Sequence, residues 1–372
     1  MMMENKNVQP WKQYQALYLH IPFCVQKCLY CDFASYAGFG EQAKRDYTDA
    51  VCKEIALRAA EAANMAANAS IYFGGGTPSV LPTECIAKLV NALKQYGFWQ
   101  QPCEATIEVN PGTADLAKLQ TLRSLGFDRI SFGVQSLQDD ELRAIGRIHN
   151  AQQALEALAL ARKAGFARIS ADLIYGLIVE DGTPLASLVD KGRITLPDDD
   201  TAADMYELVQ SFLRERGFER YEISNYAKNG QYSRHNTVYW EYHPYMAFGA
   251  AACGFDGQRR RTGLSTVKEY IGQLQSFGGD DLRASALYNV EELSCAELLE
   301  EFMFMGLRRS EGASLAEARE RFGVDVLQRF ASELAPLFEQ KLIAYDASTQ
   351  RLRLTERGME VGNQIFEVFV IT

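Results

Sequence analysis

Strand-like and helix-like stretches alternate along much of this 372-residue chain, and the alternation limits the possible folds more than any other feature. The helix-like stretches have apolar residues three or four positions apart, as in Ile86, Leu89, Val90 and Leu93. Alternating strands and helices build a parallel sheet covered by helices. We therefore predict an α/β protein with a barrel or an open sheet. The predicted strands are Ala16–Ile21, Ser70–Phe73, Glu104–Val109, Arg129–Val134, Arg168–Tyr175 and Tyr221–Ser224.

Three cysteines follow the first predicted strand with the spacing Cys24-x3-Cys28-x2-Cys31. In barrels of this kind the carboxyl ends of the strands carry the active site. Three thiolates can hold three corners of a four-iron cluster and leave one iron without a protein ligand, much as a catalytic zinc keeps one position open. A Cys3His zinc site that includes His20 is an alternative. Disulfides fit poorly, because three closely spaced cysteines are odd in number.

Polar residues follow the later strands in the same way. The glycine-rich run Gly74–Thr77 lets the backbone approach a ligand closely. Glu108 is suited to accept hydrogen bonds from two hydroxyl groups, and Arg147 can pair with a carboxylate. Asp172 lies in an apolar strand, where a carboxylate is costly unless it has a partner. With Gln135, which follows the fourth strand, these residues indicate one pocket.

These motifs resemble the radical-SAM signature. From Tyr18 to about Tyr175 the chain is similar to oxygen-independent coproporphyrinogen III oxidases and to the related heme chaperone HemW. The resemblance implies a partial (β/α)6-type barrel, a [4Fe-4S] cluster on Cys24, Cys28 and Cys31, and S-adenosylmethionine (SAM) on the open iron. It also implies reductive cleavage of SAM to methionine and a 5′-deoxyadenosyl radical. The positions that match SAM-contacting residues are Tyr18, Gly75, Gly76, Thr77, Glu108, Gln135, Arg147 and Asp172.

Two further features resemble the HemW branch. The oxidases usually carry a fourth cysteine two positions after the third, where this chain has Phe33. The run His-Asn-Thr-Val-Tyr-Trp at 235–240 matches the His-Asn-x-x-Tyr-Trp motif that the resemblance implicates in heme handling. Imidazole can ligate heme iron, and aromatic rings can stack on a porphyrin. A polar loop anchored by core aromatic residues is the alternative. The heme candidates are His235, Asn236, Tyr239 and Trp240.

The last part of the chain has a different pattern. From about Ser294 helical spacing dominates, and a short hairpin at 342–345 and 351–354 leads into a final helix at 356–370. This resembles a small, mostly α winged-helix-like domain. The predicted regions are a radical-SAM partial barrel at 1–225, a linking region with the His-Asn-x-x-Tyr-Trp motif at 226–290, and the C-terminal domain at 291–372.

Charge and hydropathy limit the partners. The net charge of −10 and the pI near 5.1 disfavour binding to nucleic acid. No window approaches the ~18 apolar residues of a membrane-spanning helix, so we expect no integral membrane segment. The N-terminus has no apolar signal-peptide core, and we expect a cytoplasmic protein.

The segment after the fifth predicted strand is shorter than the resemblance implies. In related sequences Ile-Tyr-Gly-Leu is followed by a Pro-Gly-Gln-Thr loop, a helix and a further strand, but here Gly176 leads almost directly to Gly182-Thr183-Pro184. About one βα unit of ~30 residues is therefore absent. No helix suggests itself between Gly176 and Asp200. We expect a more open barrel, or a strand from 178–180 in the vacant place, and weakened adenosine binding.

The resemblance implies a chaperone that binds heme and delivers it to respiratory proteins. One alternative is a coproporphyrinogen III oxidase that performs radical oxidative decarboxylation. Another is an iron–sulfur scaffold whose SAM binding is impaired by the shortened segment. The expected partners are heme or a porphyrin, heme-accepting respiratory proteins and an electron donor.

Overall fold

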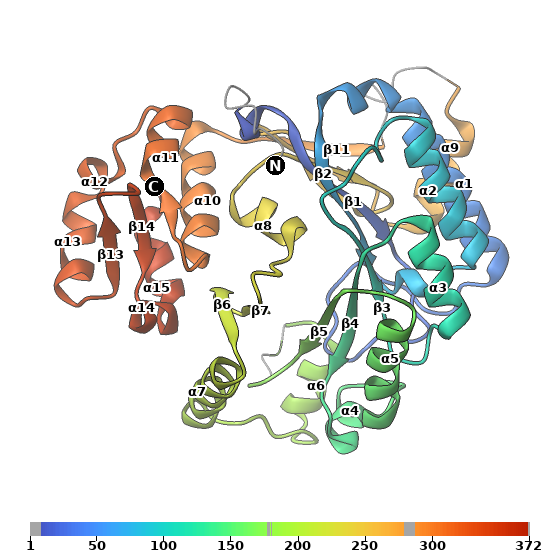
Figure 1. The fold of residues 1–372 in the computed structure, drawn as a ribbon, viewed down its shortest axis with the longest axis horizontal. Coiled ribbons are helices and arrows are strands. Elements are labelled where there is room, and N and C mark those ends of the chain that lie inside the picture. Colours follow the sequence, from blue (N-terminus) through green and yellow to red (C-terminus); the bar gives the residue numbers. More distant parts are fainter. Residues whose placement is uncertain (1–8, 177–178, 180, 279–286, 371–372) are drawn as a thin grey trace.

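The computed structural model describes residues 9–176, 179, 181–278 and 287–370. A nine-stranded sheet forms the centre of the larger part of the molecule (Figure 1). Neighbouring strands from β8 to β5 are parallel, and β9, β10 and β11 are added in antiparallel orientation. The predicted α/β fold with a partial, open barrel is confirmed. In spatial order the strands are β11 (Tyr288–Glu292), β10 (Arg259–Gly263), β9 (Cys253–Phe255), β8 (Tyr245–Phe248), β1 (Tyr14–Ile21), β2 (Met65–Gly75), β3 (Ala105–Val109), β4 (Arg129–Gln135) and β5 (Arg168–Leu173).

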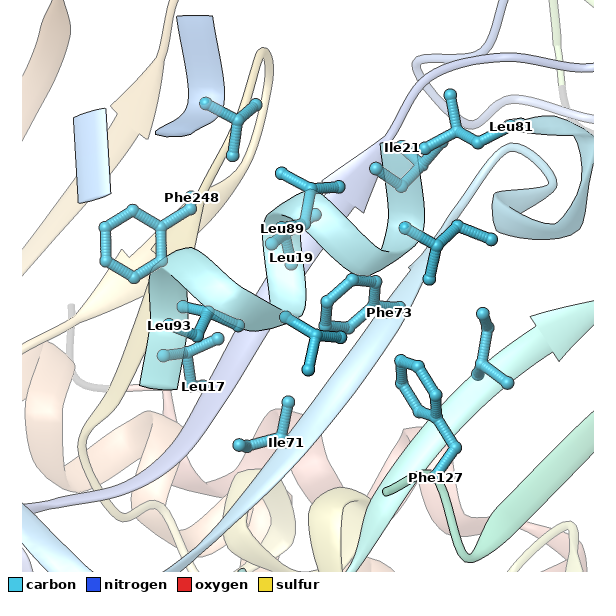
Figure 2. Packing of buried hydrophobic residues seen from close by; sticks show 14 of the residues in the cluster. Leu17, Leu19, Ile21, Ile71, Phe73, Leu81, Leu89, Leu93, Phe127 and Phe248 are labelled. Carbon is cyan, nitrogen blue, oxygen red and sulfur yellow. The ribbon is translucent and has the colours of Figure 1, made fainter. Parts of the chain in front are cut away.

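Helices bury one face of this sheet (Figure 2). Leu17 and Leu19 of β1 and Phe73 of β2 belong to the same buried cluster as Leu89 and Leu93. Each such side chain contributes roughly 1.5–3 kcal/mol when fully buried. Because successive strand residues point to opposite faces, the even-numbered residues of β1 and β2 are left for the other face, where the polar site lies. The helices on the apolar face are α1 (Glu41–Leu57), α2 (Thr83–Gln95), α3 (Leu116–Leu125) and α5 (Ala151–Lys163), with α9 (Val267–Ser276) against α1.

Local sequence sets the ends of these helices. Asn150 accepts a hydrogen bond from the backbone N of Gln153, whose side chain bonds back to Asn150 N, and this capping box starts α5. Gly126 ends α3 with a φ of 116°, a left-handed conformation that glycine adopts without steric cost. The chain can therefore turn sharply from α3 into β4.

Among the described residues the sheet ends at β5, and two predictions for the segment that follows are wrong. A helix, α6 (Pro184–Asp190), lies where none was expected, because the Thr183 hydroxyl caps the backbone N of Ala186. The predicted strand near residue 221 does not extend the sheet: β6 (Phe218–Glu222) pairs antiparallel with β7 (Asn225–Lys228) instead. Of the strand suggested for 178–180, only Val179 is described, and it is not in a strand; residues 178 and 180 lie outside the described residues. Between α6 and β6 runs α7 (Asp199–Glu215), which has no buried side chain.

The region predicted to be a linker contributes to the main sheet. Strand β8 pairs in parallel with β1, on the side opposite β2, and β9 and β10 continue the sheet from there. A short helix, α8 (Arg234–Trp240), lies against β1 and β2 (Figure 1). The sheet thus draws strands from both sides of the His-Asn-x-x-Tyr-Trp motif.

The C-terminal region has its own buried cluster, which includes Phe302, Leu352 and Phe369. The predicted hairpin is confirmed as β13 (Ile343–Asp346) and β14 (Arg351–Leu354), and β12 (Ala313–Ser314) completes a three-stranded sheet. The single final helix is wrong, because the chain breaks it into α14 (Glu356–Glu360), α15 (Gly362–Phe366) and a 3-10 helix at Glu367–Phe369. No helix of the described residues is long and apolar enough to cross a membrane. The preceding elements are α10 (Cys295–Arg308), β12 (Ala313–Ser314), α11 (Leu315–Phe322), α12 (Val326–Arg329), α13 (Ala331–Glu339), β13 (Ile343–Asp346) and β14 (Arg351–Leu354).

Candidate cofactor site at the carboxyl ends of the strands

The three motif cysteines lie on the loop that follows β1, and all three are half-buried free thiols. Backbone hydrogen bonds shape this loop. Cys24 N donates to Tyr36 O over 2.9 Å, Tyr36 N donates to Pro22 O over 2.8 Å, and Cys31 N donates to Cys28 O over 3.2 Å. The loop therefore holds the thiols at the carboxyl edge of the sheet, as the sequence predicts.

Each thiol has a polar neighbour of its own. The thiolate is the form of cysteine that binds metals. Burial raises the pKa of the Cys24 thiol, and the hydroxyl groups beside it act in the opposite direction. The pairs, with their distances to Sγ, are Thr77 Oγ1 with Cys24 at 3.6 Å, Arg147 Nη1 with Cys28 at 3.2 Å, and Ser35 Oγ with Cys31 at 3.7 Å.

His20, the fourth ligand of the alternative zinc site, is already occupied. Its Nδ1 is 2.9 Å from the Tyr18 hydroxyl, and its Nε2 is 2.9 Å from the carbonyl oxygen of Ala34. Within the described ranges, no three His, Cys, Asp or Glu side chains are grouped so as to hold one metal ion. In this conformation His20 therefore has no ring nitrogen free to complete a Cys3His zinc site.

The glycine run after β2 is joined to the cysteine loop by backbone bonds. Gly76 N donates to Ile21 O over 2.8 Å, and Thr77 N donates to Phe23 O over 2.7 Å. A Cβ atom on Gly76 would lie 2.7 Å from Phe23 O, and Gly75 has a φ of 113°. Only glycine allows both the close approach and this backbone conformation without strain. The two loops therefore form one unit.

Glu108 is the last residue but one of β3, and both of its carboxylate oxygens are hydrogen-bonded. The Tyr72 hydroxyl donates to Oε1 over 2.7 Å, and Gly75 N donates to Oε2 over 3.1 Å. Burial raises the pKa of Glu108 to about 7; the bond from Tyr72 opposes this rise, and the nearby Asp172 charge adds to it. Tyr18 stacks on Tyr72 with ring centroids 6.2 Å apart. The carboxyl group can therefore gain or lose its proton near neutral pH.

Arg147 reaches across the site to three different groups. Its guanidinium contacts Cys28 and donates to Gly133 O and, over 2.8 Å, to Asn110 Oδ1. Asn110 Nδ2 in turn donates to Thr77 Oγ1 over 2.8 Å. Arg147 Nε is buried and has no hydrogen-bond partner in the part of the chain that the structure describes, so it is a donor without an acceptor. Asn110 was not among the residues predicted from the sequence, although its position directly after β3 is the signal that could have identified it.

Gln135 and Asp172 lie at the open side of the site. Gln135 has a φ of 68°, and the register between β4 and β5 shifts beside it. Asp172 is exposed as a residue, yet desolvation still raises the pKa of its carboxyl group. Solvent reaches the residue because β5 is the last strand of the sheet. The Ser131 hydroxyl, at 3.4 Å, is its hydrogen-bond partner.

His235 is enclosed, with 1% of its surface exposed. Its Nδ1 is 3.0 Å from the Ser70 hydroxyl, and its Nε2 is 2.8 Å from the Tyr239 hydroxyl. Burial lowers the pKa of His235 to about 3. Both ring nitrogens are therefore used, and in this conformation neither is free to ligate a heme iron.

The rest of the motif builds and packs α8. The Ser233 hydroxyl caps the helix at the backbone N of Asn236. Tyr239 packs edge-on against Tyr245 with centroids 4.5 Å apart, and Trp240 packs edge-on against Tyr221 at 5.7 Å. The four histidines of the chain, His20, His149, His235 and His243, are all described, and all are buried.

Comparisons with known proteins agree with this geometry. Residues 18–191 match the model of the Radical SAM superfamily, and residues 293–361 match the HemN C-terminal domain. The heme chaperone HemW of Bacillus subtilis (strain 168) is 34% identical over 385 residues, with 96% of this chain and 99% of that protein covered. This chain belongs to the HemW family of radical SAM proteins. HemW of Haemophilus influenzae is 30% identical, with 95% of this chain and 97% of that protein covered.

A solved structure shows the same fold. Coproporphyrinogen III oxidase (HemN) from Escherichia coli matches with a TM-score of 0.79 and 22% identity, over 97% of this chain and 91% of that chain. The alignment with the Bacillus HemW also bears on the shortened segment. It runs over 385 positions, whereas 96% of 372 residues is about 357, so about 28 positions have no residue in this chain. That difference is close to the size of the βα unit predicted to be absent.

Proposed function

We propose that this protein is a radical-SAM-type chaperone that binds heme and passes it to respiratory-chain proteins in the cytoplasm. The observation that carries the proposal is the similarity, over nearly the full length, to several relatives named heme chaperone HemW. Phe33, at the position where the oxidases usually have a fourth cysteine, supports the chaperone over an oxidase. The electron donor and the heme acceptor are further parts of the proposal.

The radical SAM family implies a [4Fe-4S] cluster and SAM, and the residues present fit both. The half-buried thiols of Cys24, Cys28 and Cys31 would hold three irons and leave the fourth for SAM. When bound, the cluster supplies the electron that cleaves SAM. Among the described residues Arg147 Nε has no acceptor, and this free donor suits the SAM carboxylate. Glu108 would accept hydrogen bonds from ribose hydroxyls, the role that the resemblance implies for it, through lone pairs that the bonds from Tyr72 and Gly75 leave available.

Heme binding is the step that separates the proposal from its competitors. A heme titration of the anaerobically reconstituted protein should give a saturable Soret band with one heme per chain. The heme-loaded protein should then lose that band to an apo-cytochrome acceptor, and SAM cleavage should not be required for the transfer. A Soret spectrum identical to that of free heme, at all protein concentrations, would refute the proposed function.

A coproporphyrinogen III oxidase is the second candidate, favoured by the fold shared with HemN along nearly the whole chain. It predicts that the reduced, reconstituted protein converts coproporphyrinogen III to protoporphyrinogen in the presence of SAM. An iron–sulfur scaffold with impaired SAM binding is the third, favoured by the open edge at β5. It predicts a stable cluster with neither heme transfer nor 5′-deoxyadenosine formation.

A further inference from the structure

His235 contacts the candidate SAM site through a neighbouring aromatic ring. Its imidazole stacks on Tyr72 of β2, with centroids 4.8 Å apart and planes 28° apart. The bonds from its two nitrogens to Ser70 of β2 and Tyr239 of α8 fix the ring between a strand and a helix. Its backbone N also donates to the buried Glu104 over 3.2 Å. Rotation of the imidazole would break both side-chain bonds and the stacking, so the ring has one stable orientation.

Tyr72 extends the contact to the carboxylate of the site. Its hydroxyl donates to Glu108, and the other oxygen of Glu108 accepts the bond from Gly75 N. A Cβ atom on Gly74 would lie 2.7 Å from the Tyr72 ring and 3.1 Å from the Glu108 carboxyl carbon, so the ring and the carboxylate lie directly against the glycine run. A shift of Tyr72 would therefore move the Glu108 carboxylate relative to that run.

We propose that His235 is a positioning residue for the SAM site, which holds Tyr72 and, through it, the Glu108 carboxylate against the glycine run. The inference rests on the proposed function, since it concerns the SAM site of the family. It gives the histidine of the His-Asn-x-x-Tyr-Trp motif a role that requires it to stay enclosed. Binding of heme iron would instead require it to leave both of its hydrogen-bond partners.

The charge state of His235 suits this role. With its pKa lowered by burial, the imidazole is neutral at physiological pH and has one donor and one acceptor nitrogen. The hydroxyls of Ser70 and Tyr239 can each donate or accept, so they satisfy both nitrogens in either tautomer. A neutral ring stacked on Tyr72 adds no charge next to Glu108.

A double-mutant cycle tests the proposal. His235→Phe keeps a flat ring but loses both hydrogen bonds, and Tyr72→Phe removes the bond to Glu108. In anaerobically reconstituted protein, His235→Phe should weaken SAM binding roughly tenfold, about the effect of one lost hydrogen bond. In the Tyr72→Phe background the same change should have less than roughly a twofold effect, because the connection is already broken. Independent, multiplicative losses would overturn the proposal.

A control on the same helix separates positioning from general destabilisation. Val238→Ala removes buried methyl groups from α8 and should lower the thermal midpoint while SAM affinity stays within twofold. If it weakens SAM binding as much as His235→Phe does, the positioning role is refuted. Heme titration completes the test, because His235→Phe should leave the Soret band unchanged. Loss of that band with normal SAM affinity would assign His235 to heme instead.

A measurement that needs no cofactor tests the positioning role separately from the proposed function. If the wild-type protein fails to bind SAM, the proposed function is weakened, but the positioning role can still be tested. The groups that face Glu108 are Tyr72, Tyr18, Asp172 and the backbone N of Gly75. In cluster-free protein, infrared titration of the Glu108 carboxyl should show a higher midpoint in His235→Phe than in wild type or Val238→Ala. An unchanged midpoint would overturn the positioning role.

Discussion

Glu108 should make the folded protein less stable as the pH rises toward neutrality. Its pKa is raised from 4.5 to about 7, chiefly by burial, so the folded protein binds this proton more tightly than the unfolded chain does. The stability that this proton provides is full below about pH 4.5 and is lost as the pH rises to about 7. Since one pKa unit corresponds to 1.36 kcal/mol, the loss is at most about 3 kcal/mol.

Glu108→Gln isolates this contribution, because the amide resembles the protonated carboxyl but cannot ionise. Between pH 4.5 and 7.5 the free energy of unfolding of the wild type should fall by about 3 kcal/mol more than that of the variant. Urea unfolding of the cluster-free protein at a series of pH values measures the difference, with fluorescence of Trp99 in the main core as the signal.

The matched control is Glu156→Gln, which removes a carboxylate from the exposed side of α5. Its curve of stability against pH should run parallel to that of the wild type. If the Glu108→Gln curve is also parallel to the wild type over this range, then Glu108 titrates like a solvated carboxyl, and the account of its burial is refuted.

Three further predictions concern the two joined loops and the guanidinium. Cys24→Ala should lose most of the reconstituted iron and the visible absorbance of the cluster, whereas the exposed Cys103→Ala should keep both. Arg147→Lys should retain the cluster but weaken SAM binding roughly tenfold by equilibrium dialysis, since lysine cannot make the same fork of bonds. Gly76→Ala should lower the thermal midpoint, because the added methyl group would lie 2.7 Å from the backbone oxygen of Phe23. Gly272→Ala is the control and should leave the midpoint unchanged, because a Cβ atom there would have no atom from outside its own helix within 4 Å. A Gly76→Ala protein as stable as wild type would contradict the close approach of the two loops.

The sequence predicted the features that depend on local pattern. Strands β1 to β5 follow from apolar runs that alternate with helical spacing. Because parallel strands present their carboxyl ends on one edge of a sheet, the strand pattern alone is enough to place Cys24, Gly76 and Glu108 together. Asn110 was missed because an asparagine in a loop can form many kinds of local hydrogen bond. Only the structure shows that Asn110 accepts a bond from Arg147 and donates one to Thr77.

The features that escaped prediction depend on packing between distant segments. The burial of His235 results from the docking of α8 on β1 and β2, and a motif does not encode that contact in its spacing. Strand β8 has only four residues, Tyr245–Phe248, so it carries too little periodicity to be distinguished from a loop. Whether β6 joins the main sheet depends on the presence of a neighbouring strand, which the sequence of β6 itself does not show; it pairs with β7 instead.

The position of β5 at the end of the sheet explains how such a chain can be shortened and still fold. A strand in the interior of a sheet shares hydrogen bonds with two neighbours, so its removal would disrupt the ladders on both sides. The absence of a βα unit beyond β5 removes the hydrogen bonds of one strand pair only, and the strands from β11 to β5 stay paired in one continuous sheet. Gains and losses of βα units in this family should therefore be tolerated best at this border, where Asp172 faces solvent, and least beside β1, which carries the cysteine loop.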